Sequence, residues 1–162
     1  MKYAGLILND FNAAPGVSVS FYTQGCPHRC QGCHNPQTWD FDGGKEFDTE
    51  VLKQIIEGLT ANGIERSLCI MGGEPLCEEN QFLVSLIIDN VKEKLPKTKI
   101  YIWTGYTYEG LSKVSGSKLK NILSKTYCII DGPYIEAERD ITLPMRGSRN
   151  QNIIYLDNSK NL

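Results

Sequence analysis

Three cysteines stand close together in one short polar segment, Cys26-Pro27-His28-Arg29-Cys30-Gln31-Gly32-Cys33. Their spacing is C-x3-C-x2-C, and no fourth cysteine follows to complete the set. Structural zinc sites use four ligands, and ordinary iron–sulfur clusters use four thiolates. Three thiolates in one loop therefore indicate a [4Fe–4S] cluster ligated by Cys26, Cys30 and Cys33, with one iron open to a ligand that is not protein.

Other uses of this segment remain open. A zinc loop could take its fourth ligand from His28, His34 or Cys77, because sites with three thiolates and one histidine are common. Cys69 and Cys128 lie in apolar segments and are expected to be inert buried thiols. In a reducing compartment, clustered cysteines bind metal more often than they form disulfides.

A second candidate for chemistry is the turn Gly72-Gly73-Glu74-Pro75, which follows a short apolar segment. Two glycines allow the backbone to come close to a ligand, and the Glu74 carboxylate could accept a hydrogen bond from an ammonium group. By itself, a Gly-Gly-Glu sequence is more often only a tight turn. The turn supports a ligand site only if the fold brings it next to the cysteine segment.

The elements that would position these residues alternate between strands and helices, as hydrophobic periodicity and turn residues predict. Strands are expected at 17–22, 67–71, 99–103, 127–130 and about 152–156. Helices are expected from Asp48 to a stop at Asn62-Gly63, over about 80–94, and around 117–124. On the second helix, we expect an inward stripe of Phe82, Leu83, Leu86, Ile87 and Val91.

This alternation predicts an α/β fold built from parallel βαβ units with right-handed crossovers. The carboxyl ends of parallel strands share one edge, which would collect the cysteine segment, Gly72–Glu74, Thr104–Tyr106 and Asp131. Four or five units are too few for a closed barrel, which takes about 250 residues. We therefore expect a single domain over 1–162 with an open partial (β/α) barrel.

Composition narrows the function classes. The chain has 162 residues, a net charge of −2 and an isoelectric point near 5.7, so no strongly basic surface is predicted for nucleic acid or anionic membrane. No apolar run approaches the roughly 20 residues of a membrane helix, and the first residues lack a signal-peptide pattern. A cytoplasmic location is expected.

The cysteine motif after a strand, with Gly-Gly-Glu-Pro after the next strand, resembles the radical S-adenosylmethionine superfamily. The resemblance implies that S-adenosylmethionine chelates the open iron and is cleaved reductively to methionine and a 5′-deoxyadenosyl radical. It also implies that the cofactor contacts lie at Gly32, Cys33, His34, Gly72, Gly73, Glu74 and Thr104.

Further landmarks resemble one family within that superfamily, the anaerobic ribonucleoside-triphosphate reductase activating proteins. The landmarks are Cys30-x-Gly-Cys33-x-Asn35-Pro36-x-Thr38-Trp39, Trp103-Thr104-Gly105-Tyr106, Asp131-Gly132 and Arg146-Gly147-Ser148-x-Asn150-Gln151. The resemblance implies a glycyl radical generated on the carboxyl-terminal glycine loop of the reductase large subunit, with an electron donor such as flavodoxin or ferredoxin. Hydrogen-atom abstraction needs no acid–base pair, and the sequence offers none.

One position departs from the family pattern. The family usually has Gly-Pro-Gly followed two residues later by arginine, whereas this chain has Ala14-Pro15-Gly16-Val17-Ser18.

Two other functions remain open for this sequence. The chain could be an activator of another glycyl-radical enzyme, such as formate acetyltransferase, or a non-catalytic iron–sulfur or zinc module. Arg146 and Arg149 could meet the reductase or a carboxylate, or be solvated surface charges.

Overall fold

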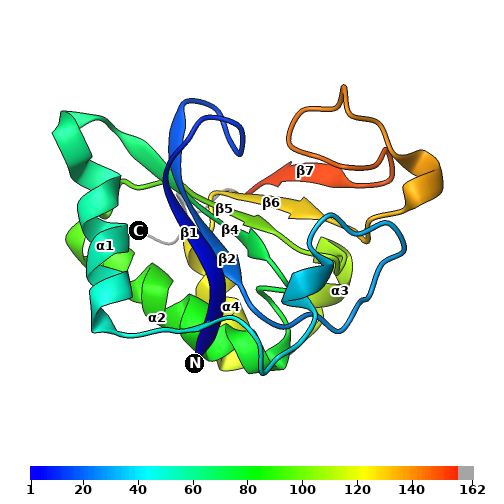
Figure 1. Ribbon diagram of the computed structural model, residues 1–162, viewed down its shortest axis with the longest axis horizontal. Coiled ribbons are helices and arrows are strands. Elements are labelled where there is room, and N and C mark those ends of the chain that lie inside the picture. Colours follow the sequence, from blue (N-terminus) through cyan, green and yellow to red (C-terminus); the bar gives the residue numbers. More distant parts are fainter. Residues whose placement is uncertain (157–162) are drawn as a thin grey trace.

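Strands and helices alternate around a single seven-stranded sheet in the computed structural model, which describes residues 1–156 (Figure 1). The order across the sheet is β3-β1-β2-β4-β5-β6-β7. The strands are β1 (Lys2–Asp10), β2 (Val17–Thr23), β3 (Lys45–Glu46), β4 (Arg66–Gly72), β5 (Ile100–Trp103), β6 (Cys128–Asp131) and β7 (Asn152–Tyr155). The α/β class is confirmed.

The centre of the sheet is parallel, as predicted. Strands β2, β4, β5 and β6 pair in parallel, and the chain between them runs through helices. The α-helices are α1 (Thr49–Thr60), α2 (Glu78–Lys94), α3 (Tyr108–Ser112) and α4 (Ser117–Lys125). Short 3-10 turns are η1 (Pro36–Thr38), η2 (Ala61–Gly63) and η3 (Glu136–Glu138).

The edges of the sheet are antiparallel. Strand β1 forms a hairpin with β2, the short β3 pairs with β1, and β7 pairs with β6. The sequence analysis missed β1, because Lys2–Asp10 has no regular alternation of apolar and polar residues. It also missed α3, whose single short turn lies below the length that periodicity can detect.

The first helix shows how local signals set an element's ends. Asp48 caps α1 by accepting a hydrogen bond from the Val51 backbone N–H at 3.0 Å, as expected of a residue at this position. The helix ends before Asn62 and Gly63, whose φ angles of 58° and 65° cannot continue it. Both predicted boundaries are confirmed.

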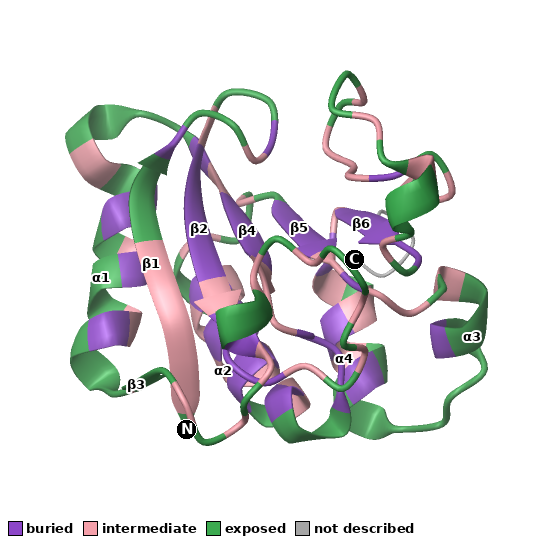
Figure 2. Ribbon diagram, turned by 45° about the vertical axis from the view of Figure 1, so that its right-hand side comes forward, coloured by how far each residue is buried: buried purple, intermediate pink, exposed green. Residues whose placement is uncertain are grey.

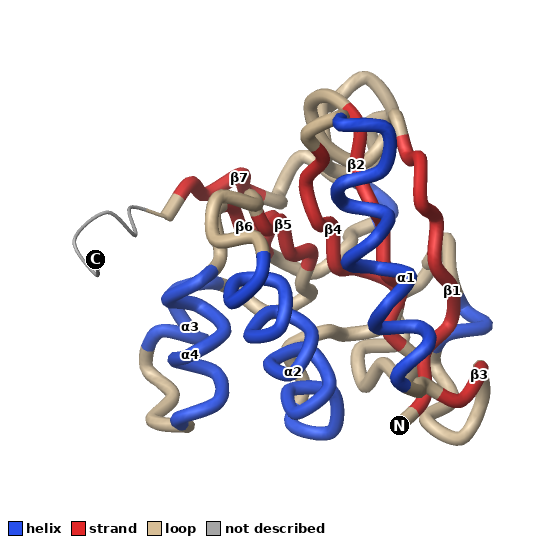
Figure 3. Tube along the Cα trace, turned by 90° about the vertical axis from the view of Figure 1, so that its left-hand side faces the viewer, coloured by secondary structure: helices blue, strands red, loops and turns tan. Residues whose placement is uncertain are grey.

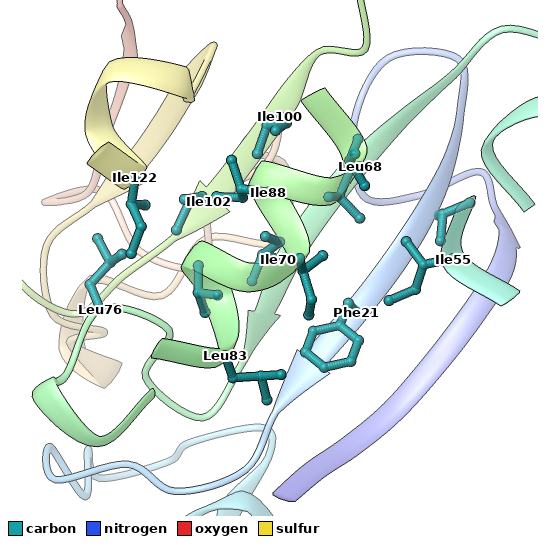
Figure 4. Close-up of a cluster of buried hydrophobic side chains, with 14 of the residues drawn as sticks. Phe21, Ile55, Leu68, Ile70, Leu76, Leu83, Ile88, Ile100, Ile102 and Ile122 are labelled. Atoms are coloured by element: carbon teal, nitrogen blue, oxygen red, sulfur yellow. The ribbon is translucent and has the colours of Figure 1, made fainter. Parts of the chain in front are cut away.

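The main core lies between the sheet and the helices α1, α2 and α4, which Figure 3 shows on the same side of the strands. Alternate residues of β2, β4 and β5 point into it because side chains alternate along a strand. Fully buried members include Phe21, Ile55, Leu68, Ile70, Ile88, Ile100, Ile102 and Ile122, drawn in Figure 4. Each contributes about 1.5–3 kcal/mol through burial of apolar surface.

One predicted core residue is misplaced. Phe82 is 52% exposed and lies under the Lys118 ammonium group, whose nitrogen is 5.4 Å from the ring centroid. The buried stripe of α2 consists of Leu83, Val84, Ile87, Ile88 and Val91. The helix therefore packs through the stripe formed by residues 83, 87 and 91, with residues 84 and 88 beside it. Phe82 consequently points toward solvent.

The other face of the sheet carries a smaller and more polar cluster. Ala14, Cys69, Tyr101, Cys128 and Ile130 are buried there. Two connections reach over this face: a hairpin loop (residues 11–16) between β1 and β2, and a long loop (residues 132–151) between β6 and β7 (Figure 2). None of the helices in residues 1–156 has the length and hydropathy of a membrane-spanning segment.

Candidate cluster and cofactor site

The three clustered cysteines lie on the loop that follows β2, at the carboxyl end of the strand. Backbone hydrogen bonds from Gly25 N to Thr38 O (2.7 Å) and from Cys26 N to Trp39 O (3.2 Å) close this loop. All three thiols are free, partly exposed and line one cavity of about 480 Å³. The Sγ atom of Cys33 also accepts a hydrogen bond from Asn35 N at 3.4 Å.

Most of the predicted cofactor contacts line the same cavity, namely Cys33, His34, Gly72, Gly73, Glu74 and Thr104. Gly32 does not line it. Its φ angle of 76° lies in the left-handed region that favours glycine, so it allows the turn between Cys30 and Cys33. The fold thus brings together the cysteines and the Gly72–Glu74 turn.

Glu74 is the most constrained side chain of the site. It has no exposed surface, and its carboxylate accepts four hydrogen bonds. Oε1 accepts from Thr104 Oγ1 (2.7 Å) and Leu76 N (2.9 Å). Oε2 accepts from Gly105 N (2.7 Å) and His28 Nε2 (2.7 Å). A carboxylate offers about four lone-pair sites, so the protein uses the whole acceptor capacity of Glu74.

This hydrogen-bonding pattern gives Glu74 a structural role. The carboxylate joins the cysteine loop, the turn after β4 and the turn after β5. The contact of Glu74 with an ammonium group of a cofactor stays a prediction. His28 is drawn into the same network, and its ring also packs edge-on against Tyr106, with centroids 4.6 Å apart.

The glycines of the turn are required by contact between two loops. A Cβ atom at Gly73 would overlap the backbone carbonyl of Gly25, whose oxygen accepts from Glu74 N at 2.9 Å. Asn80 of α2 donates from Nδ2 to the carbonyls of Gly25 (3.2 Å) and Glu74 (2.9 Å). Gly73 therefore allows close contact with the cysteine loop itself, and the expected close approach of a ligand to this turn stays a prediction.

Two of the three alternative fourth ligands for zinc, Cys77 and His28, are engaged in hydrogen bonds, whereas His34 lines the cavity with the cysteines. Cys77 is 3% exposed and donates from Sγ to the Glu74 carbonyl at 3.2 Å, and His28 is bound to the Glu74 carboxylate. His34 is exposed, and its ring lies 5.6 Å from that of Tyr134. Within residues 1–156, no three His, Cys, Asp or Glu side chains converge on a single ion. A cluster does not require such convergence, because its thiolates bind different irons.

Burial separates the six thiols into two groups. Burial raises the pKa of Cys69 and Cys77 to about 12 and that of Cys128 to about 11. For Cys26, burial also raises the pKa and the Glu74 charge adds to this, while backbone hydrogen bonds from His28 and Arg29 oppose it. Cys69 and Cys128 have no exposed surface, as predicted for thiols within strands.

Comparison with known proteins agrees with this arrangement. The family described as "4Fe-4S single cluster domain" matches residues 13–154. The chain belongs to this family. It is 33% identical over 157 residues to the anaerobic ribonucleoside-triphosphate reductase-activating protein of Pasteurella multocida, covering 96% of this chain and 97% of that protein.

Two other relatives carry the same name. The protein of Haemophilus influenzae is 34% identical over 152 residues, covering 93% of this chain and 96% of the relative. The protein of Enterobacteria phage T4 is 32% identical over 153 residues, covering 94% of this chain and 93% of the relative. The predicted resemblance to reductase activating proteins, and to proteins with an iron–sulfur cluster, is confirmed.

The segment 146–151, one of the stretches that resemble the reductase activating proteins, has a structural role in this chain. Gln151 Oε1 accepts from Gly147 N (2.9 Å) and Ser148 N (3.1 Å), and its Nε2 donates to Gly132 O (3.0 Å). Asn150 Nδ2 donates to Pro133 O at 2.7 Å. These bonds tie the two ends of the long loop together and hold its residues along the cavity.

The sequence analysis missed several residues of the cavity wall, namely Asn12, Ala13, Met71, Leu143 and Met145. None of them belongs to a motif, although Met71 directly precedes the Gly72–Glu74 turn and Met145 directly precedes Arg146. Trp103 also lines the cavity and donates from Nε1 to Met145 O at 2.8 Å. Ser18, at the position of the family's usual arginine, is fully buried in β2, and its side chain lies beside the Cys69 thiol.

Proposed function

We propose that this chain is a radical S-adenosylmethionine activase for an anaerobic ribonucleoside-triphosphate reductase. The observation that carries the proposal is a shared cavity: Cys26, Cys30 and Cys33 line it together with the Gly72–Glu74 turn, and Glu74 bonds the two loops to each other. The names of the relatives point to the same reductase.

The three thiols and the volume of the cavity fit the iron–sulfur cluster and the cofactor that the proposal requires. Three free, partly exposed thiols on one loop are suitable ligands for a [4Fe–4S] cluster with one open iron. A volume of about 480 Å³ lies within the range of small-molecule sites. We propose that Cys26, Cys30 and Cys33 hold the cluster, and that S-adenosylmethionine binds beside Gly72 and Gly73.

When bound, the cluster supplies the electron that cleaves S-adenosylmethionine and so provides the radical that removes a hydrogen atom from a glycine of the reductase. The residues of the chain orient and enclose these groups. Glu74 fixes the cysteine loop relative to the turns after β4 and β5. Met71, Trp103, Leu143 and Met145 give the cavity apolar wall, which limits access of water to a reactive species.

The remaining elements of the proposal concern the whole chain. We propose that the sheet, whose edge strands are β3 and β7, is the open partial (β/α) barrel of the superfamily, and that residues 1–162 form one domain. Residues 157–162 lie outside the described part. We further propose that the protein works in the cytoplasm, with flavodoxin or ferredoxin as electron donor and the large subunit of the reductase as substrate.

Anaerobic reconstitution tests the function. The proposal expects about four iron and four sulfide per chain, release of methionine and 5′-deoxyadenosine on reduction, and a glycyl-radical doublet in electron paramagnetic resonance after addition of the reductase. Stoichiometric zinc without cleavage would contradict it. Cleavage without a radical on the reductase would point instead to another glycyl-radical enzyme.

A further inference from the structure

The cavity is bounded on two sides by loops that come from opposite ends of the chain. Asn12 and Ala13 of the hairpin loop line one wall, and Leu143 and Met145 of the long loop line another. Figures 1 and 2 show both loops rising from the same side of the sheet. The cavity that holds the cysteines therefore extends between two projecting loops.

Each of these loops exposes a large hydrophobic side chain next to the cavity wall. Phe11 directly precedes Asn12 and is 70% exposed, and Ile141 lies two residues before Leu143 and is 83% exposed. No other large hydrophobic residue in the described part is as exposed as these two. A single exposed apolar residue needs no explanation, but two beside the walls of one cavity indicate a contact surface.

Arg146 adds a charged donor to the same cavity. Its guanidinium lines the cavity and donates from Nη1 to Gln151 O at 3.2 Å. Its Nε is buried without a hydrogen-bond partner among the described residues, and Asp140, the carboxylate that senses the Arg146 charge, lies beyond the 4 Å of an ion pair. The guanidinium therefore keeps free donor capacity beside the cavity, which favours a ligand that supplies acceptor oxygens.

We propose that the hairpin loop and the long loop form the docking surface for the glycine-bearing segment of the reductase, an inference that rests on the proposed function. Phe11 and Ile141 contact apolar side chains on either side of the glycine. Because glycine has no side chain, the segment inside the cavity is recognised through its backbone, and Arg146 donates to a main-chain carbonyl there. The occupant is thus an extended, locally apolar peptide segment of the partner protein.

The test compares two surfaces of the reconstituted protein. The double variant Phe11→Ser/Ile141→Ser is expected to bind the purified reductase at least about tenfold more weakly, because buried aromatic and aliphatic contacts dominate such interfaces. Phe82→Ser is the matched control, since Phe82 is 52% exposed on α2, away from the cavity, and its affinity should stay within about twofold. Reductase affinity is measured without oxygen by biolayer interferometry or sedimentation.

Two further measurements distinguish a loss of reductase docking from damage to the cofactor site. Reductive cleavage of S-adenosylmethionine without the reductase should persist in the double variant, which distinguishes lost docking from a damaged site. Arg146→Lys should raise the reductase concentration needed for half-maximal glycyl-radical formation while leaving the affinity for S-adenosylmethionine, measured by equilibrium dialysis, unchanged.

The proposed docking surface would be wrong if the double variant bound the reductase with wild-type affinity. It would also be wrong if Arg146→Lys lost affinity for S-adenosylmethionine, because Arg146 would then be a cofactor contact. A wild-type protein that binds the reductase but cleaves no S-adenosylmethionine would overturn the proposed function instead. Binding by wild type and double variant can still be compared in that case.

Discussion

The helix-covered face of the sheet and the site at the carboxyl ends of its strands are built on different physical principles. The face covered by α1, α2 and α4 buries aliphatic and aromatic side chains such as Phe21 and Ile70, whose attraction is non-directional. At the carboxyl ends of the strands, the network that closes the cavity depends on hydrogen bonds whose lengths and angles matter. The core provides most of the stability, and the network provides the geometry of the site.

Glu74 is where the two parts meet. Its turn follows β4, which belongs to the core, and its carboxylate reaches the loop that carries the cysteines. The comparison therefore predicts that changes in the core beneath the helices alter stability with the site intact, whereas changes at the site also alter cluster binding.

The largest effect is expected for the clustered cysteines. Replacing any one of Cys26, Cys30 and Cys33 by alanine removes a thiolate and should reduce the iron content from about four per chain to near zero. Cys69→Ala and Cys128→Ala should retain the cluster, because both thiols are fully buried in strands. Iron and sulfide assays after anaerobic reconstitution measure the difference, and loss of iron in Cys69→Ala would mean that the ligands are misassigned.

Glu74→Ala should cause the next largest effect. The change leaves four donors without their acceptor, and we expect the free energy of unfolding of the apoprotein to fall by about 4 kcal/mol. Urea denaturation measures this fall, and reconstitution should yield little cluster. Glu78→Ala, at an exposed position a few residues along the chain, should change stability by less than about 0.5 kcal/mol.

Ile70→Ala tests the helix-covered face alone. Removing three buried carbon atoms from a fully buried position should lower the free energy of unfolding by about 3 kcal/mol. Iron content after reconstitution well below the unfolding temperature should equal that of the wild type. A variant that is destabilised and also lacks the cluster would contradict the separation of the core from the site.

The two histidines allow a smaller, matched test. His28→Ala removes one donor to Glu74, so we expect a loss of about 1–2 kcal/mol in unfolding free energy and faster release of iron to a chelator. His34 also flanks the cysteines but is exposed and has no contact with Glu74. His34→Ala should behave like the wild type in both measurements, and equal iron release from the two variants would show that the Glu74 bond does not hold the loop.

The smallest effect is expected at the start of α1. Asp48→Ala removes the side chain that caps the helix and should cost about 1 kcal/mol in thermal or urea unfolding. Asp48→Asn keeps an oxygen acceptor and should recover most of that loss. Cluster content should not change in either variant, because α1 packs on the face away from the cavity.

The sequence alone determined the local and periodic features of this protein. The parallel strands, the three longer helices and the ends of α1 follow from hydrophobic spacing and from capping and turn residues, all of which act over a few neighbouring positions. The cysteine spacing and the family landmarks led to an iron–sulfur protein related to reductase activating proteins. The roles of the site residues stay predictions until the experiments are done.

Only the tertiary structure decided which distant residues meet. Glu74, His28 and Thr104 are far apart in the chain, and nothing in their spacing reveals that one carboxylate accepts from both of the other side chains. The hairpin loop and the long loop contribute to one cluster because each joins an antiparallel pair of strands, β1 with β2 and β6 with β7, and reaches over the same face of the sheet. Sequence periodicity reports which side of an element is apolar, whereas contacts between loops depend on how the whole sheet is assembled.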